Sequence, residues 1–145
     1  LYAVVAVLLL PIQCWAEELF FRGWILRWAA PLTRISQVVL GGVIFALPHA
    51  GNPEANGQLL PALSAWFLLG AGWSYVSIRD GGIEVAMGAH LANNVFALLF
   101  VGYGDAALPS YAVVSTSALN MSATVVSLAI VVPLFAIITR RRQLS

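Results

Sequence analysis

The chain has 145 residues, of which 61% are hydrophobic and only 9% are charged, and its formal net charge is +1. A soluble domain carries about a quarter charged residues because water must wet its surface, so this composition excludes an ordinary soluble domain and indicates a protein embedded in lipid. The positively charged residues are all arginines, and they do not form a basic patch with interleaved aromatic residues. This distribution argues against nucleic-acid binding. The single Cys14 allows neither a disulfide nor a cysteine-based metal site.

Five apolar segments meet or approach the ~20 residues that a helix needs to cross a bilayer. They cover, in chain order, about residues 2–29, 35–47, 59–78, 83–101 and 111–139. Pro11 predicts a kink in the first segment, and Pro48 ends the second. We therefore predict an all-α polytopic transmembrane bundle of about five spans, with residues 1–145 forming a single membrane-embedded domain. Because the chain begins at Leu1 inside an apolar run, we also expect that N-terminal sequence is missing.

The distribution of arginine predicts the topology of these segments. Alternation of the spans gathers all the arginine-bearing ends on one side, namely Arg27, Arg34, Arg79 and residues 140–142. The loops on the other side carry Glu54 and Asp105 and no basic residue. Because arginine is enriched in cytoplasmic loops, we expect an integral protein of the bacterial plasma membrane with a cytoplasmic C-terminus.

Polar side chains inside the apolar segments are the candidates for function, because such groups are costly in a membrane and usually face the bundle interior. The candidates are Glu17, Glu18, Arg22, His49, His90 and Asn94. At a rise of about 1.5 Å per residue, those from three different helices reach broadly similar depths. We therefore predict that they form one site.

The spacing of these residues indicates their pairing. Glu18 and Arg22 are four residues apart, so they share a helix face and can form an ion pair, whereas Glu17 points about 100° away. His90 and Asn94 are also four residues apart. A carboxylate assisted by a histidine can take a proton from water, and a histidine with an amide can stabilise an oxyanion. The set therefore suffices for hydrolysis of an amide bond.

Three motifs in the same order resemble those of the CPBP family of intramembrane proteases, which includes the type II CAAX prenyl endopeptidases and the Abi proteins of bacteriocin processing and self-immunity. EExxxR is present as Glu17, Glu18 and Arg22, FxxxH as Phe45 and His49, and HxxxN as His90 and Asn94. Each motif alone is weak, but all three fall on predicted membrane helices between about residues 14 and 96. The resemblance implies an intramembrane endopeptidase.

The resemblance also implies roles for the individual residues. Glu17 would be the general base, acting with His49 on the attacking water. His90 and Asn94 would form the oxyanion site, while Glu18 and Arg22 would organise the centre. The substrate would be a membrane-associated peptide or protein, prenylated in CAAX-type processing.

Three alternatives stay open at the level of the sequence. The protease is either glutamate-dependent without a bound metal, which we favour, or a metalloendopeptidase with zinc held by Glu17, His49 and His90. HExxH, the strong local signature of zinc proteases, is absent from the sequence. The same polar set would also serve a non-catalytic membrane immunity or binding protein. It would equally serve a proton-relay component of a transporter.

Overall fold

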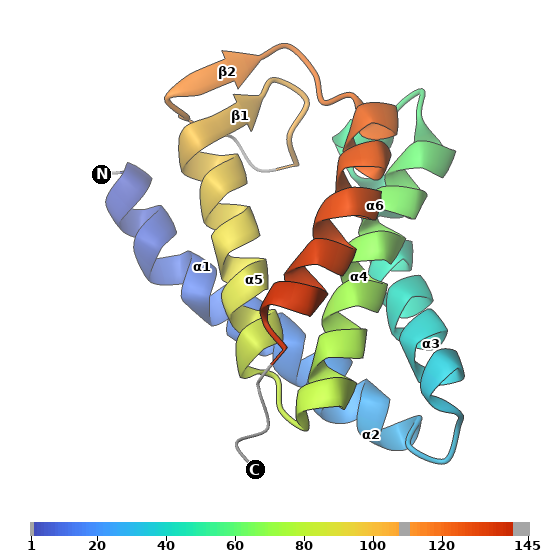
Figure 1. Ribbon diagram of the computed structural model, residues 1–145. Coiled ribbons are helices and arrows are strands. Elements are labelled where there is room, and N and C mark those ends of the chain that lie inside the picture. The colour runs from blue at the N-terminus through green and yellow to red at the C-terminus, as the bar shows by residue number, and fades with distance from the viewer. Residues whose placement is uncertain (1, 108–110, 141–145) are drawn as a thin grey trace.

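The computed structural model describes residues 2–107 and 111–140, and their fold is a bundle of helices with a small strand pair at one end (Figure 1). The helical elements are α1 (Tyr2–Glu18), the π-helix η1 (Leu19–Ile25), α2 (Leu26–Trp28), α3 (Arg34–Ala46), the 3₁₀ turns η2 (Leu47–Gly51) and η3 (Pro53–Ala55), α4 (Leu59–Asp80), α5 (Glu84–Val95), the π-helix η4 (Phe96–Phe100) and α6 (Met121–Ile138). Strands β1 (Val101–Tyr103) and β2 (Val114–Thr116) pair in parallel.

The first four predicted helical segments lie within a few residues of their predicted places, because local chemistry sets where they begin and end. The Thr33 hydroxyl accepts a hydrogen bond from the Ser36 backbone N–H at 3.2 Å, which caps the N-terminus of α3. Helix α4 ends at Gly81, which adopts a left-handed φ of 68° and donates its N–H to the Ser77 carbonyl.

Within the described part of the chain, three helices are long and apolar enough to cross a membrane by length and composition. They are Val4–Trp28, Leu59–Asp80 and Met121–Ile138. Helix α3 and the Glu84–Phe100 helix are shorter than the ~20 residues of a full span. The transmembrane helical class is confirmed, and three of its helices reach full spanning length.

The predicted start of the last helix is wrong, because α6 begins at Met121 and not near residue 111. In the intervening segment, Val114–Thr116 pairs with Val101–Tyr103 as a strand. Valine and threonine favour extended backbone because they are branched at Cβ. Asn120 then caps α6 by accepting a hydrogen bond from the Ala123 N–H at 3.0 Å.

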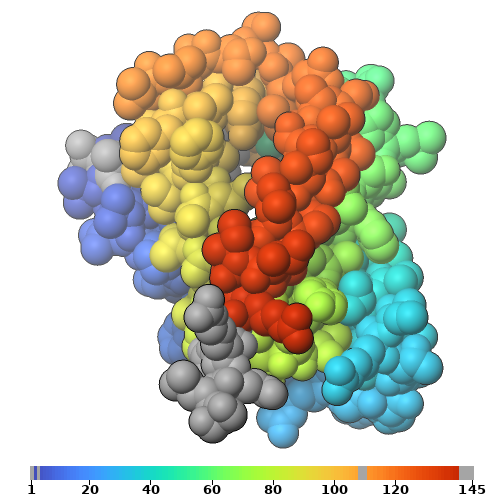
Figure 2. Space-filling view, viewed as in Figure 1, coloured from blue at the N-terminus to red at the C-terminus, as the bar shows by residue number. Residues whose placement is uncertain are grey.

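Helix α4 is the centre of the packing, since it contacts α3, α5 and α6, whereas α1 runs along α5. Small residues bring α3 and α4 close together: a Cβ at Gly70 would lie 2.6 Å from the Cβ of Phe45. Helix α6 lies across the front of the molecule, beside α4 (Figure 2). The α3–α4 contact fixes Phe45 in the interior, where it is 2% exposed.

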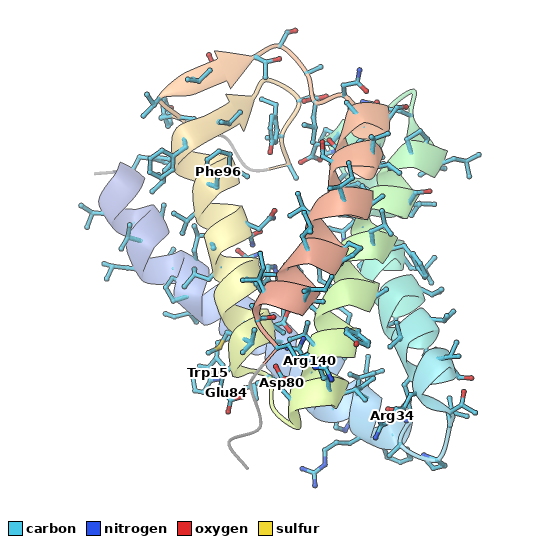
Figure 3. All side chains as sticks on the ribbon, viewed as in Figure 1. Trp15, Arg34, Asp80, Glu84, Phe96 and Arg140 are labelled. Atoms are coloured by element: carbon cyan, nitrogen blue, oxygen red, sulfur yellow. The ribbon has the colours of Figure 1, made fainter. Side chains whose placement is uncertain are left out.

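The charged residues outside the candidate site divide between the two ends of the bundle. Arg34, Asp80, Glu84 and Arg140 lie toward the same end (Figure 3). Arg79 binds the C-terminal turn of α6 there, through the carbonyls of Ala136 and Thr139. At the other end, Glu54 accepts a hydrogen bond from the Ala107 N–H at 2.8 Å, and Asp105 accepts one from the Leu119 N–H at 3.1 Å. Which end faces the cytoplasm stays a prediction.

Candidate functional site

Glu18, Arg22 and His90 form an ion cluster in the interior of the bundle, with exposed fractions of 0%, 3% and 3%. Arg22 donates from Nη1 to Glu18 Oε1 at 3.0 Å, as the spacing predicts. His90 donates from Nδ1 to the same oxygen at 2.8 Å. Since a carboxylate oxygen accepts, this bond places a proton on Nδ1 of His90 and orients Nε2 away from Glu18.

Aromatic rings surround the cluster and contact the side chains of Arg22 and His90. The guanidinium carbon of Arg22 lies 4.8 Å from the ring centre of Phe45 and 5.4 Å from that of Trp73. The indole of Trp73 stacks on His90, with 4.4 Å between ring centres and 22° between planes. Arg22 also donates from Nη2 to the Gly70 carbonyl at 3.1 Å. These contacts fix Arg22 and His90 because each side chain is held by both a charge and a ring.

A cavity of about 530 Å³ adjoins this cluster. Four of the six predicted site residues line it: Glu17 from α1, His49 from η2, and His90 and Asn94 from α5. Glu18 and Arg22 are not among its lining residues. The structure therefore brings the predicted residues together in two layers, a buried ion pair and four side chains that face a space able to hold a ligand.

Glu17 occupies the α1 wall of this cavity, and its side chain is 29% exposed. Its Oε2 lies 3.7 Å from Nε2 of His90, and its Oε1 accepts a hydrogen bond from Nε2 of Gln13 at 2.9 Å. Glu17 thus faces away from the Arg22 pair, as the 100° rotation per residue predicts. His90 connects the two glutamates, with one ring nitrogen toward each.

His49 lies on the η2 wall and is oriented by its own helical turn. Its Nδ1 donates to the Phe45 carbonyl at 2.8 Å, which leaves Nε2 of the neutral ring with a lone pair. Its ring centre lies 5.2 Å from the Trp66 ring centre and 4.9 Å from that of Phe45. Among the described residues no hydrogen bond joins His49 to Glu17, so the two can cooperate only on a molecule placed between them.

Asn94 lies one helical turn beyond His90, and its neighbours differ from those of His90. Its Nδ2 donates to the Cys14 sulfur at 3.6 Å, and its Oδ1 accepts from Asn93 Nδ2 at 3.2 Å. Sulfur is a weak acceptor, so the Asn94 amide retains donor capacity toward the cavity. Cys14 itself is fully buried.

The helix that carries Glu17 and the helix that carries Asn94 both change to π-helix close to the site. The sequence pattern did not predict this change. The π-helix η1 begins directly after Glu18, and η4 begins two residues after Asn94. Short π-helical insertions occur frequently at functional sites because the extra residue per turn re-aims neighbouring side chains.

Sequence reasoning missed the residues that support the site without belonging to the motifs. Gln13, Trp66, Trp73 and Asn93 all line the cavity. A signal for two of them was present, because Trp66 and Trp73 are seven residues apart and therefore share one face of α4. Gln13 was also detectable, as an amide in an apolar run four residues before Glu17.

The zinc alternative requires Glu17, His49 and His90 to converge on one ion. Among the residues that the structure describes, no group of three or more His, Cys, Asp or Glu side chains is arranged to hold a metal ion. The donor set present does not fit a bound zinc in this geometry, so no step of the reaction is derived through a metal.

Comparison with known proteins gives the family. The model of the type II CAAX prenyl endopeptidase Rce1-like family matches residues 1–96, which include all six predicted site residues. A relative in Bacillus subtilis (strain 168), "Uncharacterized protein YyaK", is 40% identical over 99 residues; these are 66% of this chain and 33% of that protein. The match thus covers about a third of the length of the curated relative. No solved structure matches the chain. The chain belongs to the type II CAAX prenyl endopeptidase Rce1-like family.

Proposed function

We propose that the chain is the catalytic part of an intramembrane endopeptidase that hydrolyses a peptide bond in a membrane-associated protein or peptide. One observation carries the proposal. Side chains from α1, η2 and α5, which are far apart in the sequence, line one cavity of about 530 Å³ beside a buried ion pair. A carboxylate, two imidazoles and an amide around a common space are the groups that amide hydrolysis needs.

In the proposed reaction, Glu17 takes a proton from a water molecule that lies between it and His49. The free Nε2 of His49 accepts a hydrogen bond from the same water and aims it at the scissile carbonyl. The Asn94 amide, and His90 when its Nε2 also carries a proton, donate to the oxyanion that forms. Glu17 then passes its proton to the amine nitrogen as the C–N bond breaks. Glu18 and Arg22 keep His90 in position, because Glu18 binds its Nδ1 at 2.8 Å and Arg22 binds Glu18 at 3.0 Å.

The surroundings of the site favour a substrate that arrives from the membrane. The cavity wall includes Leu10, Phe21 and Leu69 beside the polar groups, so it can hold an apolar side chain next to the scissile bond. Prenylated proteins in CAAX-type processing, and precursor peptides in bacteriocin maturation or self-immunity, are the candidate substrates. We place the protein in the bacterial plasma membrane with its C-terminus in the cytoplasm.

The decisive experiment compares the parent protein with Glu17→Gln on fluorogenic hydrophobic peptides, with and without a prenyl group. Glutamine keeps the shape of the side chain but cannot accept the proton, so cleavage should be abolished while thermal unfolding stays close to that of the parent. Near-parental cleavage by Glu17→Gln would show that this residue is not the base.

The oxyanion role is tested separately, by His90→Ala and Asn94→Ala. Each variant should lower kcat by roughly 10²–10³, the cost of losing one oxyanion donor, with little change in peptide binding. Weaker binding with normal turnover of the bound peptide would assign these residues to substrate capture.

Two rival functions give different results in the same assays. A non-catalytic immunity or binding protein would bind the peptides but cleave none of them in the parent form. A proton relay would move protons across liposome membranes, and Glu17→Gln would stop that transport.

A further inference from the structure

Gln13 is a polar side chain that the family motifs do not include, although it lines the same cavity as Glu17. It directly follows the apolar residues from Leu8 to Ile12, in a helix long enough to cross the membrane. An amide there is costly unless it has a partner or a function. Its position therefore requires an explanation beyond packing.

The partner of Gln13 is Glu17, to which it donates at 2.9 Å from the same face of α1. This is the one hydrogen bond of the Gln13 side chain among the described residues. The Glu17 side chain is 29% exposed, so burial alone does not fix its orientation. Gln13 holds Oε1, and the other oxygen, Oε2, points at His90 Nε2, 3.7 Å away.

We propose, on the basis of the proposed function, that Gln13 is a positioning residue for the general base. Its amide N–H sets the rotation of the Glu17 carboxylate, which leaves Oε2 for the reacting water and for His90. Gln13 therefore fixes which carboxylate oxygen of Glu17 faces the reacting water.

Two variants of similar size remove the donor in different ways. Gln13→Met keeps the length of the side chain but donates nothing, and Gln13→Glu adds a second carboxylate four residues before Glu17. Loss of a hydrogen bond to a charged group is worth about tenfold or more in rate, so Gln13→Met should lower kcat by roughly tenfold because the carboxylate is no longer held toward the water. Gln13→Glu should lower kcat further because the two carboxylates repel. The KM should stay within about twofold.

The matched control is Gln37→Met. Gln37 donates to the backbone carbonyl of Leu32 at 2.9 Å, in the loop between α2 and α3, and does not line the cavity. This substitution should leave kcat and KM unchanged. An unchanged kcat in Gln13→Met would overturn the inference, and a raised KM with unchanged kcat would overturn it as well, because that result assigns Gln13 to substrate binding.

A second readout separates this inference from the proposed function. Carbodiimides react with accessible carboxyl groups, and peptide mass spectrometry measures the extent of reaction at Glu17. The Gln13 amide covers Oε1 of Glu17, so Gln13→Met should increase labelling of Glu17 several-fold under identical conditions, whether or not the protein cleaves peptides. Absent cleavage by the parent would sink the proposed function, and the labelling result would still decide on Gln13. Equal labelling in parent and variant would refute the positioning role.

Discussion

Arg22→Met is the most informative perturbation of the buried cluster. The substitution keeps an unbranched side chain but removes the hydrogen bonds to Glu18 Oε1 at 3.0 Å and to the Gly70 carbonyl at 3.1 Å. Glu18, which is fully buried, then keeps one hydrogen bond, from His90, and its Oε2 already has no partner among the described residues. The variant therefore leaves a carboxylate without its counter-ion in the interior.

The size of the effect follows from this geometry. Removing one member of a buried ion pair costs about 3–5 kcal/mol, and loss of the contact between the guanidinium and the Phe45 ring adds up to about 2 kcal/mol. For a chain of this size, 1 kcal/mol lowers the melting temperature by about 2–4 °C. Arg22→Met should therefore melt roughly 6–28 °C below the parent.

Thermal unfolding in detergent, followed by tryptophan fluorescence, measures this change, since Trp73 lies against the cluster. Arg27→Met is the matched control because Arg27 is exposed, and it should shift the free energy of unfolding by no more than about 0.5 kcal/mol. The double variant Glu18→Gln with Arg22→Met should recover much of the loss, since it removes both charges. A single variant that melts within about 2 °C of the parent would refute the buried pair.

Three further predictions concern packing, pH and metals. Gly70→Ala should destabilise the protein by about 1–3 kcal/mol, because the new Cβ would lie 2.6 Å from the Cβ of Phe45. Gly88→Ala should stabilise α5 by about 0.5–1 kcal/mol, because nothing lies within 4 Å of the new Cβ. Chemical denaturation measures the free energy of unfolding of both variants. Burial and the charges of Glu54 and Asp105 raise the pKa of Tyr103 above its ordinary value of 10.0. Its contribution to stability is therefore present below pH 10 and lost as pH rises through the higher folded-state pKa, so Tyr103→Phe should flatten the fall in melting temperature above pH 10. Peptide cleavage should persist after dialysis against a zinc chelator; loss of cleavage that zinc restores would establish the metal-dependent alternative.

The sequence alone was sufficient to predict the environment and most of the helices. Apolar runs of near-bilayer length have one stable backbone form in lipid, because a helix pairs its own amide groups internally. The spacing of Glu18 and Arg22 likewise predicted their ion pair, since residues four apart meet on any helix. The strand in the segment after Tyr103 could not be predicted from such local patterns. This strand exists through pairing between Val101–Tyr103 and Val114–Thr116, which are separated in the sequence.

Only the tertiary structure decided how the polar residues divide between the buried layer and the cavity. Helical spacing grouped His90 with Asn94, yet packing of α5 against α1 brings the His90 ring to Glu18 and Glu17. Trp73 acquires its contact with His90 in the same way, through packing of α4 against α5. Sequence spacing determines which residues share one helix face. Which faces meet depends on the shapes of all the packed side chains, and this information is distributed over the whole chain.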